Sequence, residues 1–521
     1  MSSRSIASGL CVLWLIFVVP TGLSAEEKVS LSLEDCLLGA MKYNLRIVAE
    51  KVTPEIADMT VTRAVEVFLP SLSFSYDQQD TNSASYSFID ASGQVSTSIQ
   101  NYRVSFDQTV PTGGRIFASL TSYRNENNRS FQTINPRYGS TLTFNFVQPL
   151  LKNFGWGISR REYIIARNSL DISESQFRSA LTDIIYSVEE AYWNLVYSME
   201  YLKVRERSLK LARDLLEESR RKVEVGTLAP IDLFTAEAEV ATREADILQA
   251  QAMVGNSRDR LRSIVNMPEF QGKKDLVIEP TDNPRFEPRS VKFEEAFAVA
   301  LARRPDLEAL RSDMKNREFN VRFAGNQLLP ELNLTASYWS PGISGNRILY
   351  LDGNALTGVV VGNIPGASTD ALKDAFNFKY DNWSIALTLD IPLKTALSRA
   401  DFAIARAGLR QTRLRMENME KELEFELQTA IRAVDTGFKR ILAYTSAREL
   451  AEKKLEAESE KLRVGKSTNY LLLQYQRDLA DARTTELKAM VDYTLALSDL
   501  DRVMGLTFEA KNIAFTSVLS D

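Results

Sequence analysis

Residues 188–226 read VEEAYWNLVYSMEYLKVRERSLKLARDLLEESRRKVEVG, and they contain the clearest structural pattern of the chain. An apolar side chain recurs here at every seventh position, which predicts a long helix with one packed seam. A second stretch, at 427–465, repeats the pattern with Arg448 as its single break. Proline is absent from 157–225 and from everything beyond Pro392, so neither helix need be interrupted. We predict full-length helices over 158–225 and 397–464, each roughly 100 Å long at ~1.5 Å per residue. The seam positions are Val188, Leu195, Leu202, Leu209, Leu216 and Val223, then Leu427, Val434, Ile441, Arg448, Leu455 and Leu462.

The two seams are copies of each other, because the chain is a duplication. Val225-Gly226 matches Val464-Gly465, and Phe68-Leu69-Pro70 matches Leu328-Leu329-Pro330. Each copy is predicted to contain a half-length helix, a strand region, a full-length helix and a second half-length helix. The first repeat is predicted at 26–267, with its first helix near 33–68, strands at 71–150 and its last helix at 230–266. A linker that is rich in proline, glycine and charge follows at 268–290. The second repeat is predicted at 291–506, with its first helix near 292–328, strands at 331–392 and its last helix at 469–505, and a tail follows at 507–521.

The strand regions alternate apolar and small polar residues with period two. Leu72, Phe74 and Tyr76 alternate with serines, and Leu332 and Leu334 alternate with polar residues in the same way. The pattern suits a lipid-facing strand, and equally a half-buried sheet of a soluble domain. If the strands cross a membrane, their number per copy must be even, because both flanking helices lie on one side. The second copy then has two crossings and the first has two or four. The smallest single-chain barrels have about eight strands, so several chains would have to share one barrel.

The N-terminal residues predict export. Arg4 precedes an apolar run from Leu10 to Val19, and a small-residue site ends at Ala25. This order is typical of a secretory signal peptide at 1–25, with an uncleaved anchor helix as the alternative. Cleavage removes Cys11 and leaves Cys36 as the one thiol. Because Cys36 matches Ala296 in the second copy, we expect a small packing residue; the alternative is a reactive thiol or an intermolecular disulfide.

Composition excludes several classes of function. The chain has 521 residues, with 63 Lys and Arg against 68 Asp and Glu, so its net charge of −5 gives no electrostatic reason to expect nucleic acid. It contains no histidine, which removes His-based acid–base catalysis, His-containing triads and His-containing metal sites. No P-loop, paired CxxC or glycine-rich dinucleotide loop is visible. We therefore predict a protein that is not an enzyme and has no cofactor and no metal site.

In the order and duplication of these motifs, the chain resembles the TolC-like outer-membrane channel family. The resemblance rests on the Phe-Leu-Pro and Leu-Leu-Pro motifs, on Gln148-Pro149-Leu150-Leu151 and Ile391-Pro392-Leu393 at the strand ends, and on the two Val-Gly turns. It implies an α+β membrane channel: a trimer in which four strands per chain close a shared 12-stranded β-barrel, above a periplasmic α-barrel of coiled-coil helices. It also implies an outer-membrane location, with most of the mass in the periplasm and outer-membrane lipid around the barrel.

The same resemblance implies the partners and the site. Members act as passive outer-membrane channels of tripartite efflux or type I secretion systems. They receive substrates from a periplasmic adaptor (membrane fusion) protein and an inner-membrane pump of the resistance-nodulation-division, ABC or major-facilitator type. The adaptor is expected to dock at the turns that end the full-length helices. These predicted docking tips are Val225, Gly226, Thr227 and Leu228 in the first copy, and Val464, Gly465, Lys466 and Ser467 in the second.

Local chemistry also predicts how these turns are built. Gly226 and Gly465 suit left-handed helix caps, and Ala229 and Thr468 occupy the N-cap positions of the return helices. Leu228 is expected to be exposed, as an apolar contact for a partner. By motif position Asp232 falls on an acidic ring at the periplasmic entrance of the family. It equally suits the first helical turn after Pro230, where a carboxylate is favoured by the helix dipole. Two further acidic positions of the family fall on Leu471 and Gln474, which puts an entrance closed by carboxylate rings in doubt.

A second class of protein fits the helices alone. Long heptad helices also suit a periplasmic coiled-coil scaffold or adaptor that has no pore. The strand alternation, the half-length helices and the unbroken register of the two copies favour the channel.

Overall fold

The computed structural model describes residues 28–513 apart from 88–89, 91–92, 271, 274–275 and 285. The predicted signal peptide with Cys11, and the end of the tail, lie outside these residues. The chain divides into two compact units. The hairpin unit comprises the chain up to Leu45, Ser187–Glu287 and Gly437–Leu495, and the sheet unit comprises Arg46–Tyr186, Pro288–Thr436 and the chain from Ala496 onward. Within the described residues, none of the helices combines the length and apolarity that crossing a membrane requires.

Two helical hairpins supply the long helices. Helix α4 (Arg161–Glu224) is followed by α5 (Pro230–Val265), and α9 (Ala396–Arg463) by α10 (Asn469–Val503). In the hairpin unit the seam of α4 packs against both return helices. Its core contains Leu209, Ala212, Leu215, Val240, Leu472 and Leu473, with Leu455 and Leu462 from α9 packed against it. The seven-residue pattern therefore marks the surface along which one hairpin contacts the other.

Arg448 interrupts the second seam in a way that the sequence did not indicate. Its guanidinium pairs with Glu486 at 2.7 Å and with Glu452 at 2.9 Å, and only 24% of the side chain is exposed. Glu486 is buried on α10. Arg448 is thus part of an ion-pair cluster inside the second hairpin, because a buried carboxylate faces it across the seam.

The hairpin unit also contains a small tie that joins distant segments. Strand β1 (Lys28–Leu31) pairs in parallel with β6 (Val277–Pro280), which lies inside the predicted linker. The Asp282 carboxylate accepts hydrogen bonds from the backbone N–H of Leu33 at 2.7 Å and from the Tyr192 hydroxyl at 2.9 Å. Burial raises the pKa of the Tyr192 hydroxyl above its ordinary value, so it stays a donor. The tie holds the start of the chain against α4.

Each predicted first half-length helix is broken into two. The first copy has α1 (Leu33–Tyr43) and α2 (Leu45–Glu66), and the second has α6 (Phe293–Arg303) and α7 (Pro305–Asn326). At Arg304 the break follows from Pro305, which disfavours helical backbone in the residue before it. At Asn44 the side-chain amide instead donates to the Ile264 carbonyl at 2.6 Å, and the backbone is extended. The continuous helices expected near 33–68 and 292–328 are therefore wrong.

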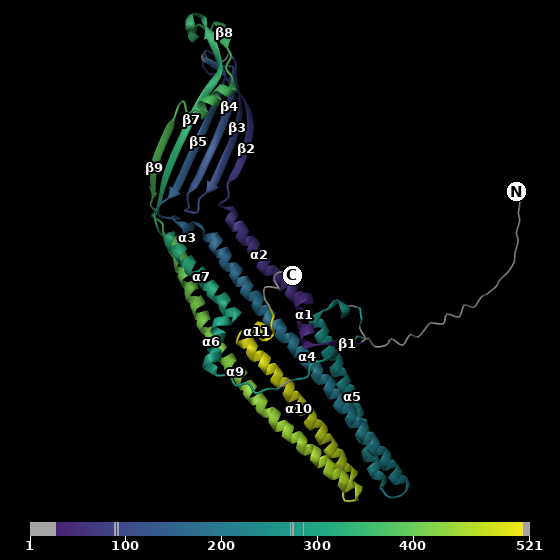
Figure 1. Ribbon diagram of the computed structural model, residues 1–521. Helices are drawn as coiled ribbons and strands as arrows, with labels where there is room; N and C mark the ends of the chain where they lie inside the picture. Colours follow the sequence, from purple (N-terminus) through teal and green to yellow (C-terminus); the bar gives the residue numbers. More distant parts are fainter. Residues whose placement is uncertain are drawn as a thin grey trace, which may run out of the picture. The chain divides into compact units, whose positions relative to one another are not determined.

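The sheet unit contains one antiparallel sheet of seven described strands. Their order is β2-β3-β4-β5-β7, and β7 then pairs with β9 along its first half and with the short β8 near its end (Figure 1). Four long strands come from the first copy and two from the second, which settles the alternative left open by the sequence. The sheet therefore has six long strands where the family resemblance implies four strands per chain, because the first copy carries one more hairpin. The strands are β2 (Ser71–Ala84), β3 (Gln94–Thr109), β4 (Arg115–Asn127), β5 (Ile134–Pro149), β7 (Glu331–Tyr350), β8 (Val360–Ile364) and β9 (Asn382–Asp390).

A short helix, α8 (Ser368–Phe376), covers part of this sheet. It packs on Gly342 of β7, where an added Cβ would collide with the Ala371 carbonyl oxygen. Ala371 and Ala375 are fully buried in this contact. Close approach of α8 therefore depends on small residues on both sides. The remaining described helical segments are α3 (Trp156–Ser159), α11 (Thr507–Ala510) and the 3₁₀ turns Pro268–Phe270, Leu351–Gly353 and Ala355–Thr357.

Candidate functional site

The first predicted tip is a capped helix end. Gly226 has a positive φ of 77°, and its N–H donates to the Val223 carbonyl at 3.0 Å. The Thr227 N–H and hydroxyl both donate to the Lys222 carbonyl. This is the Schellman arrangement, in which a left-handed residue satisfies the last carbonyls of a helix. Ala229 then takes the N-cap position without a side-chain hydrogen bond, and Pro230 takes the first helical position.

The second tip repeats this geometry and adds a side-chain clasp. Gly465 has a φ of 76°, and the Lys466 N–H donates to the Lys461 carbonyl at 2.8 Å. The Ser467 hydroxyl donates to the carboxylate of Glu458, which also accepts from the Lys461 ammonium. The hydrogen bond from Ser467, and then the one from Lys461, hold the pKa of Glu458 below its usual value. Ser467 is therefore partly committed to its own turn, which lessens its availability to a partner.

The exposed apolar groups at these tips differ from the one that the sequence predicted. Leu228 is only half-exposed, so the expectation that it projects into solvent is wrong. Val225 is 73% exposed, and its neighbours on the return helix are exposed to a similar degree. Periodicity along α5 and α10 could have indicated them, since they fall off the heptad seam. The exposed apolar tip residues are Val225, Ile231 and Phe234 in the first copy and Val464, Tyr470 and Leu471 in the second.

The residues of the predicted entrance are partly neutral in this chain. Asp232 lies in the first turn of α5 and is half-exposed. Leu471 and Gln474 are exposed one turn apart on α10, so they share a face. No ionisable group is present at either of those two positions. A repulsive ring at this level would have to rest on Asp232 alone.

A buried polar cluster joins the two hairpins near the tips, and sequence reasoning missed it. Arg243 of α5 is 4% exposed and pairs with Glu239 at 2.9 Å. Its guanidinium also donates to the Ser208 carbonyl of α4 and to the Gln476 side chain and Leu473 carbonyl of α10. Asn469 makes a second link, donating to the Ser219 hydroxyl at 2.7 Å. The bonds from Arg243 to α10 and from Asn469 to Ser219 cross from one hairpin to the other, so in this chain the two tips form one packed body.

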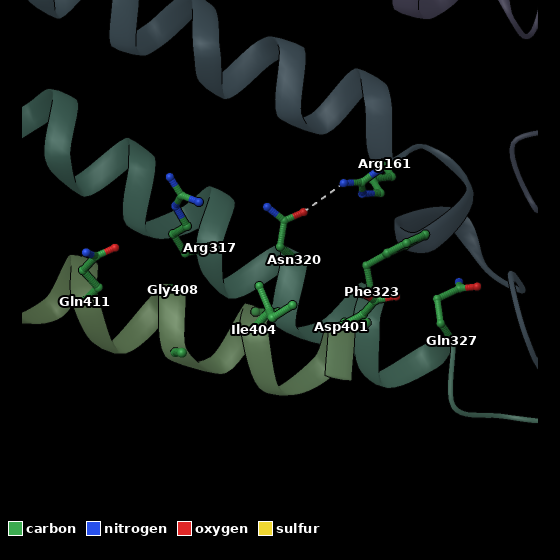
Figure 2. A pocket seen from close by; sticks show the side chains of 12 residues that line it. Arg161, Arg317, Asn320, Phe323, Gln327, Asp401, Ile404, Gly408 and Gln411 are labelled. Carbon is green, nitrogen blue, oxygen red and sulfur yellow. Dashed lines mark hydrogen bonds between the residues drawn. The ribbon is translucent and has the colours of Figure 1, made fainter. Parts of the chain in front are cut away.

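The sheet unit contains a groove of about 790 Å³ between α7 and α9, with Arg161 from the start of α4 at its edge (Figure 2). Arg161 donates to the Asn320 side chain at 3.3 Å and lies over the Phe323 ring. The lining mixes polar and apolar side chains without converging donors. Across the described residues no group of Cys, Asp and Glu side chains is arranged to hold a metal ion.

Comparison with solved structures identifies the fold. The CmeC outer membrane channel of Campylobacter jejuni matches with a TM-score of 0.63 at 16% identity, over 94% of this chain and 89% of that one. The outer membrane protein VceC of Vibrio cholerae matches with a TM-score of 0.62 at 15% identity, over 91% of this chain and 96% of that one. The fold is that of the TolC-like outer-membrane channels.

Sequence comparison then gives the family. The profile of the outer membrane efflux protein family matches residues 55–267 and 297–506. The outer membrane protein TolC of Vibrio cholerae is 24% identical over 394 residues, which is 73% of this chain and 80% of that protein. The alkaline protease secretion protein AprF of Pseudomonas aeruginosa is 21% identical over 350 residues, 65% of each chain. This chain belongs to the outer membrane efflux protein family. It is a non-enzymatic outer-membrane channel component for efflux or type I secretion, with a large periplasmic portion.

Proposed function

We propose that this chain forms, as a homotrimer, the outer-membrane conduit of a tripartite export assembly. Three copies pass cargo from a periplasmic adaptor and an inner-membrane pump to the outside without chemistry of their own. Relatives named for protease secretion and for toxin and drug export support both kinds of cargo. The pump is of the resistance-nodulation-division, ABC or major-facilitator class, as the family resemblance implies.

Unpartnered apolar surface supports assembly with further copies. On α2, Ile56 and Met59 are more than 60% exposed one turn apart, and on α9 Ile404 and Phe425 are exposed to a similar degree. A monomer rarely leaves apolar stripes of this kind along its helices in water. Both stripes lie in the sheet unit, on the helices that flank its strands. Contact with the neighbouring copies would bury them.

The observation that carries the docking proposal is the pair of matched tips. Both are rigidly capped, and each presents exposed apolar side chains at a helix end, where polar groups are the norm. Such a surface fits the helical tip of another protein. We therefore assign adaptor docking to the two Val-Gly turns and to the first turns of α5 and α10. Asp232 lies beside this surface in the first turn of α5, where a carboxylate is favoured by the helix dipole.

Photocrosslinking tests the docking surface directly. A photoreactive amino acid at Val225 or Tyr470 is expected to capture the adaptor in cells with active export. The same amino acid at Leu248, which is 68% exposed farther along α5, is the matched control and should capture none. Capture at Leu248 but at neither tip would contradict the assignment.

Substitution of the cap glycines provides the functional arm. Gly226→Asp and Gly465→Asp should abolish export while the protein still reaches the outer membrane as a trimer. A Cβ at either glycine meets no atom within 4 Å, so the cost is the left-handed backbone and the new charge. The matched variant Gly226→Asn introduces a side chain of the same size as Asp, which tolerates left-handed backbone and carries no charge. It should therefore retain more export than Gly226→Asp. An equal loss of export in both variants would show that the altered turn conformation, and not the charge, causes the loss.

A further inference from the structure

The first copy carries a strand hairpin that the second copy lacks. The second copy has two long strands, β7 and β9, between its helices. In the first copy, β2 and β5 occupy the corresponding places, because β2 follows Phe-Leu-Pro and β5 leads to Gln-Pro-Leu-Leu. Strands β3 and β4 lie between them, 16 and 13 residues long. A membrane-crossing strand needs about 9–11 residues, so both are long enough to span.

The added strands continue the two-faced character of the sheet. Register places Tyr102, Val104 and Phe106 of β3 on the face that carries Phe74 and Tyr76 of β2. The alternate residues of β3 include Arg103 and Asp107, and Asp107 pairs with Arg115 of β4 at 2.7 Å. One face of the sheet is therefore mainly apolar and the other mainly polar, as in a sheet between lipid and a water-filled lumen.

The turn between β3 and β4 is built into the base of the sheet. The Thr112 hydroxyl donates to the Gln148 side chain at 2.8 Å, and the Gly155 N–H donates to the Thr112 carbonyl at 3.0 Å. Gly113 has a φ of 93° and lies so close to the Asn153 carbonyl that a Cβ there would collide with it. The hairpin is thus fastened to the connection between β5 and α4, which is the route by which the sheet joins its helices.

Both edges of the sheet are open and complementary. Among the described residues, β2 pairs only with β3 and β9 only with β7, and nearly all residues of these two strands are exposed. Strand β2 leads away from its helix and β9 leads back to one, so β2 of one copy can pair antiparallel with β9 of the next. Open edges facing lipid would leave backbone groups without partners. Copies of this chain would therefore close the sheet with all six long strands in the ring.

We infer that the pore of this protein is closed by eighteen strands, six from each of three copies. This deepens the proposed homotrimer and rests on it. Because barrel diameter grows roughly linearly with strand number, the lumen would be about 1.5 times as wide as that of a twelve-stranded ring. The exit through the outer membrane would then admit cargo of larger cross-section than four strands per chain allow.

Electron cryomicroscopy of the full-length protein in phosphatidylethanolamine–phosphatidylglycerol nanodiscs tests the inference. We expect a threefold ring of eighteen strands, with β3 and β4 between β2 and β5 in every copy. A ring of twelve strands would overturn the inference. Such a ring could contain six strands from each of two chains, or four from each of three chains with β3 and β4 left out of the ring. A variant that lacks residues 94–127 is the matched comparison, since it joins β2 to β5 and should close with twelve strands.

Ion conductance across planar bilayers separates this inference from the proposed function. A protein that conducts and shows a twelve-stranded ring is a channel, and only the strand number is then wrong. A protein that neither conducts nor forms a ring in lipid would overturn the channel and this inference together. The unmodified protein decides both points even if the deletion variant does not fold.

Discussion

Arg448 and Glu486 occupy, in the second copy, the positions that Leu209 and Ile247 occupy in the first. Leu209 and Ile247 pack in one apolar cluster, whereas Arg448 and Glu486 form an ion pair of 2.7 Å. The first hairpin therefore makes this contact with apolar side chains, and the second makes it with an ion pair. A partly buried ion pair gains little over a well-packed apolar pair, but loss of one partner leaves a desolvated charge.

We expect Arg448→Leu to destabilise the protein by about 2 kcal/mol, because Glu486 then loses its closest cation. The double change Arg448→Leu with Glu486→Ile rebuilds the apolar pair of the first copy and should recover most of that loss. Leu209→Asp, which places an unpaired charge in the packed seam, should cost at least as much as Arg448→Leu. Thermal melts of the detergent-solubilised protein compare the variants. No recovery in the double variant would show that the two copies are not equivalent here.

Cys36 is expected to be a packing residue without thiol chemistry. It is fully buried on α1, and burial, with smaller contributions from Asp35 and Asp282, raises the pKa of its thiol to about 12. A thiolate is therefore scarce at neutral pH. Maleimide should label Cys36 only after unfolding, and Cys36→Ala should retain export with a small loss of stability. Rapid labelling of the folded protein, or a large loss of export, would instead favour a reactive thiol.

At the scale of elements, the hairpins depend on how their ends are capped. Both turns use a left-handed glycine, but their return helices start differently. Thr468 accepts a hydrogen bond from the Leu471 N–H at 3.4 Å, whereas Ala229 has no side-chain acceptor and relies on Pro230. The second turn also has the contact of Glu458 with Ser467. The second tip is therefore held by charge in addition to backbone hydrogen bonds.

The order of the second tip should depend on pH. The pKa of Glu458 is lowered in the folded protein, so its contribution is present above its ordinary pKa and is lost as pH falls through the lowered value. Hydrogen exchange of amides 464–471, corrected for intrinsic rates, should stay constant from pH 7 to 5 and rise below about pH 4. Glu458→Gln should show the faster exchange already at pH 7. Glu460→Gln, whose partner Arg463 is exposed, is the control and should leave exchange unchanged.

At the scale of the whole molecule, the proposed assembly with further copies would cover the surfaces that one chain leaves unpaired. The open edges of β2 and β9 and the apolar stripes of α2 and α9 cannot all be satisfied within one chain. Lipid would cover the apolar face of the sheet, and neighbouring copies would cover its edges and the stripes. Assembly and membrane insertion are therefore linked, since each supplies what the other leaves exposed.

We expect a detergent-requiring trimer. Native mass spectrometry of protein extracted from outer membranes should give three chains per particle, with the mature chain beginning after Ala25. Ile56→Asp on the α2 stripe should weaken the trimer, because the charge would be buried between copies. The matched control Leu248→Asp changes an exposed residue of α5 and should not. A monodisperse, water-soluble monomer would rule out the assembly.

The long helices of the two hairpins, their lengths and the two turns could be predicted from the sequence because their causes are local. A seven-residue apolar period, the absence of proline and a glycine at each helix end act within a few residues. The alternation that predicts the strands also acts between neighbouring residues, and the duplication could be recognised because short motifs of the first half recur in the second. Asp232 and the cap glycines were located for the same reason, since a turn between two helices specifies its own positions.

Features that depend on a residue far away in the sequence became apparent only in the folded chain. Arg448 could not be assigned without Glu486, and the break at Asn44 depends on the carbonyl of Ile264. The pairing of β1 with β6 joins segments about 250 residues apart, and no sequence pattern within either segment predicts it. The number of strands was open because alternation does not say which strands pair. Exposure at the tips was also undetermined, since whether Leu228 or Val225 faces solvent depends on what packs beside each of them.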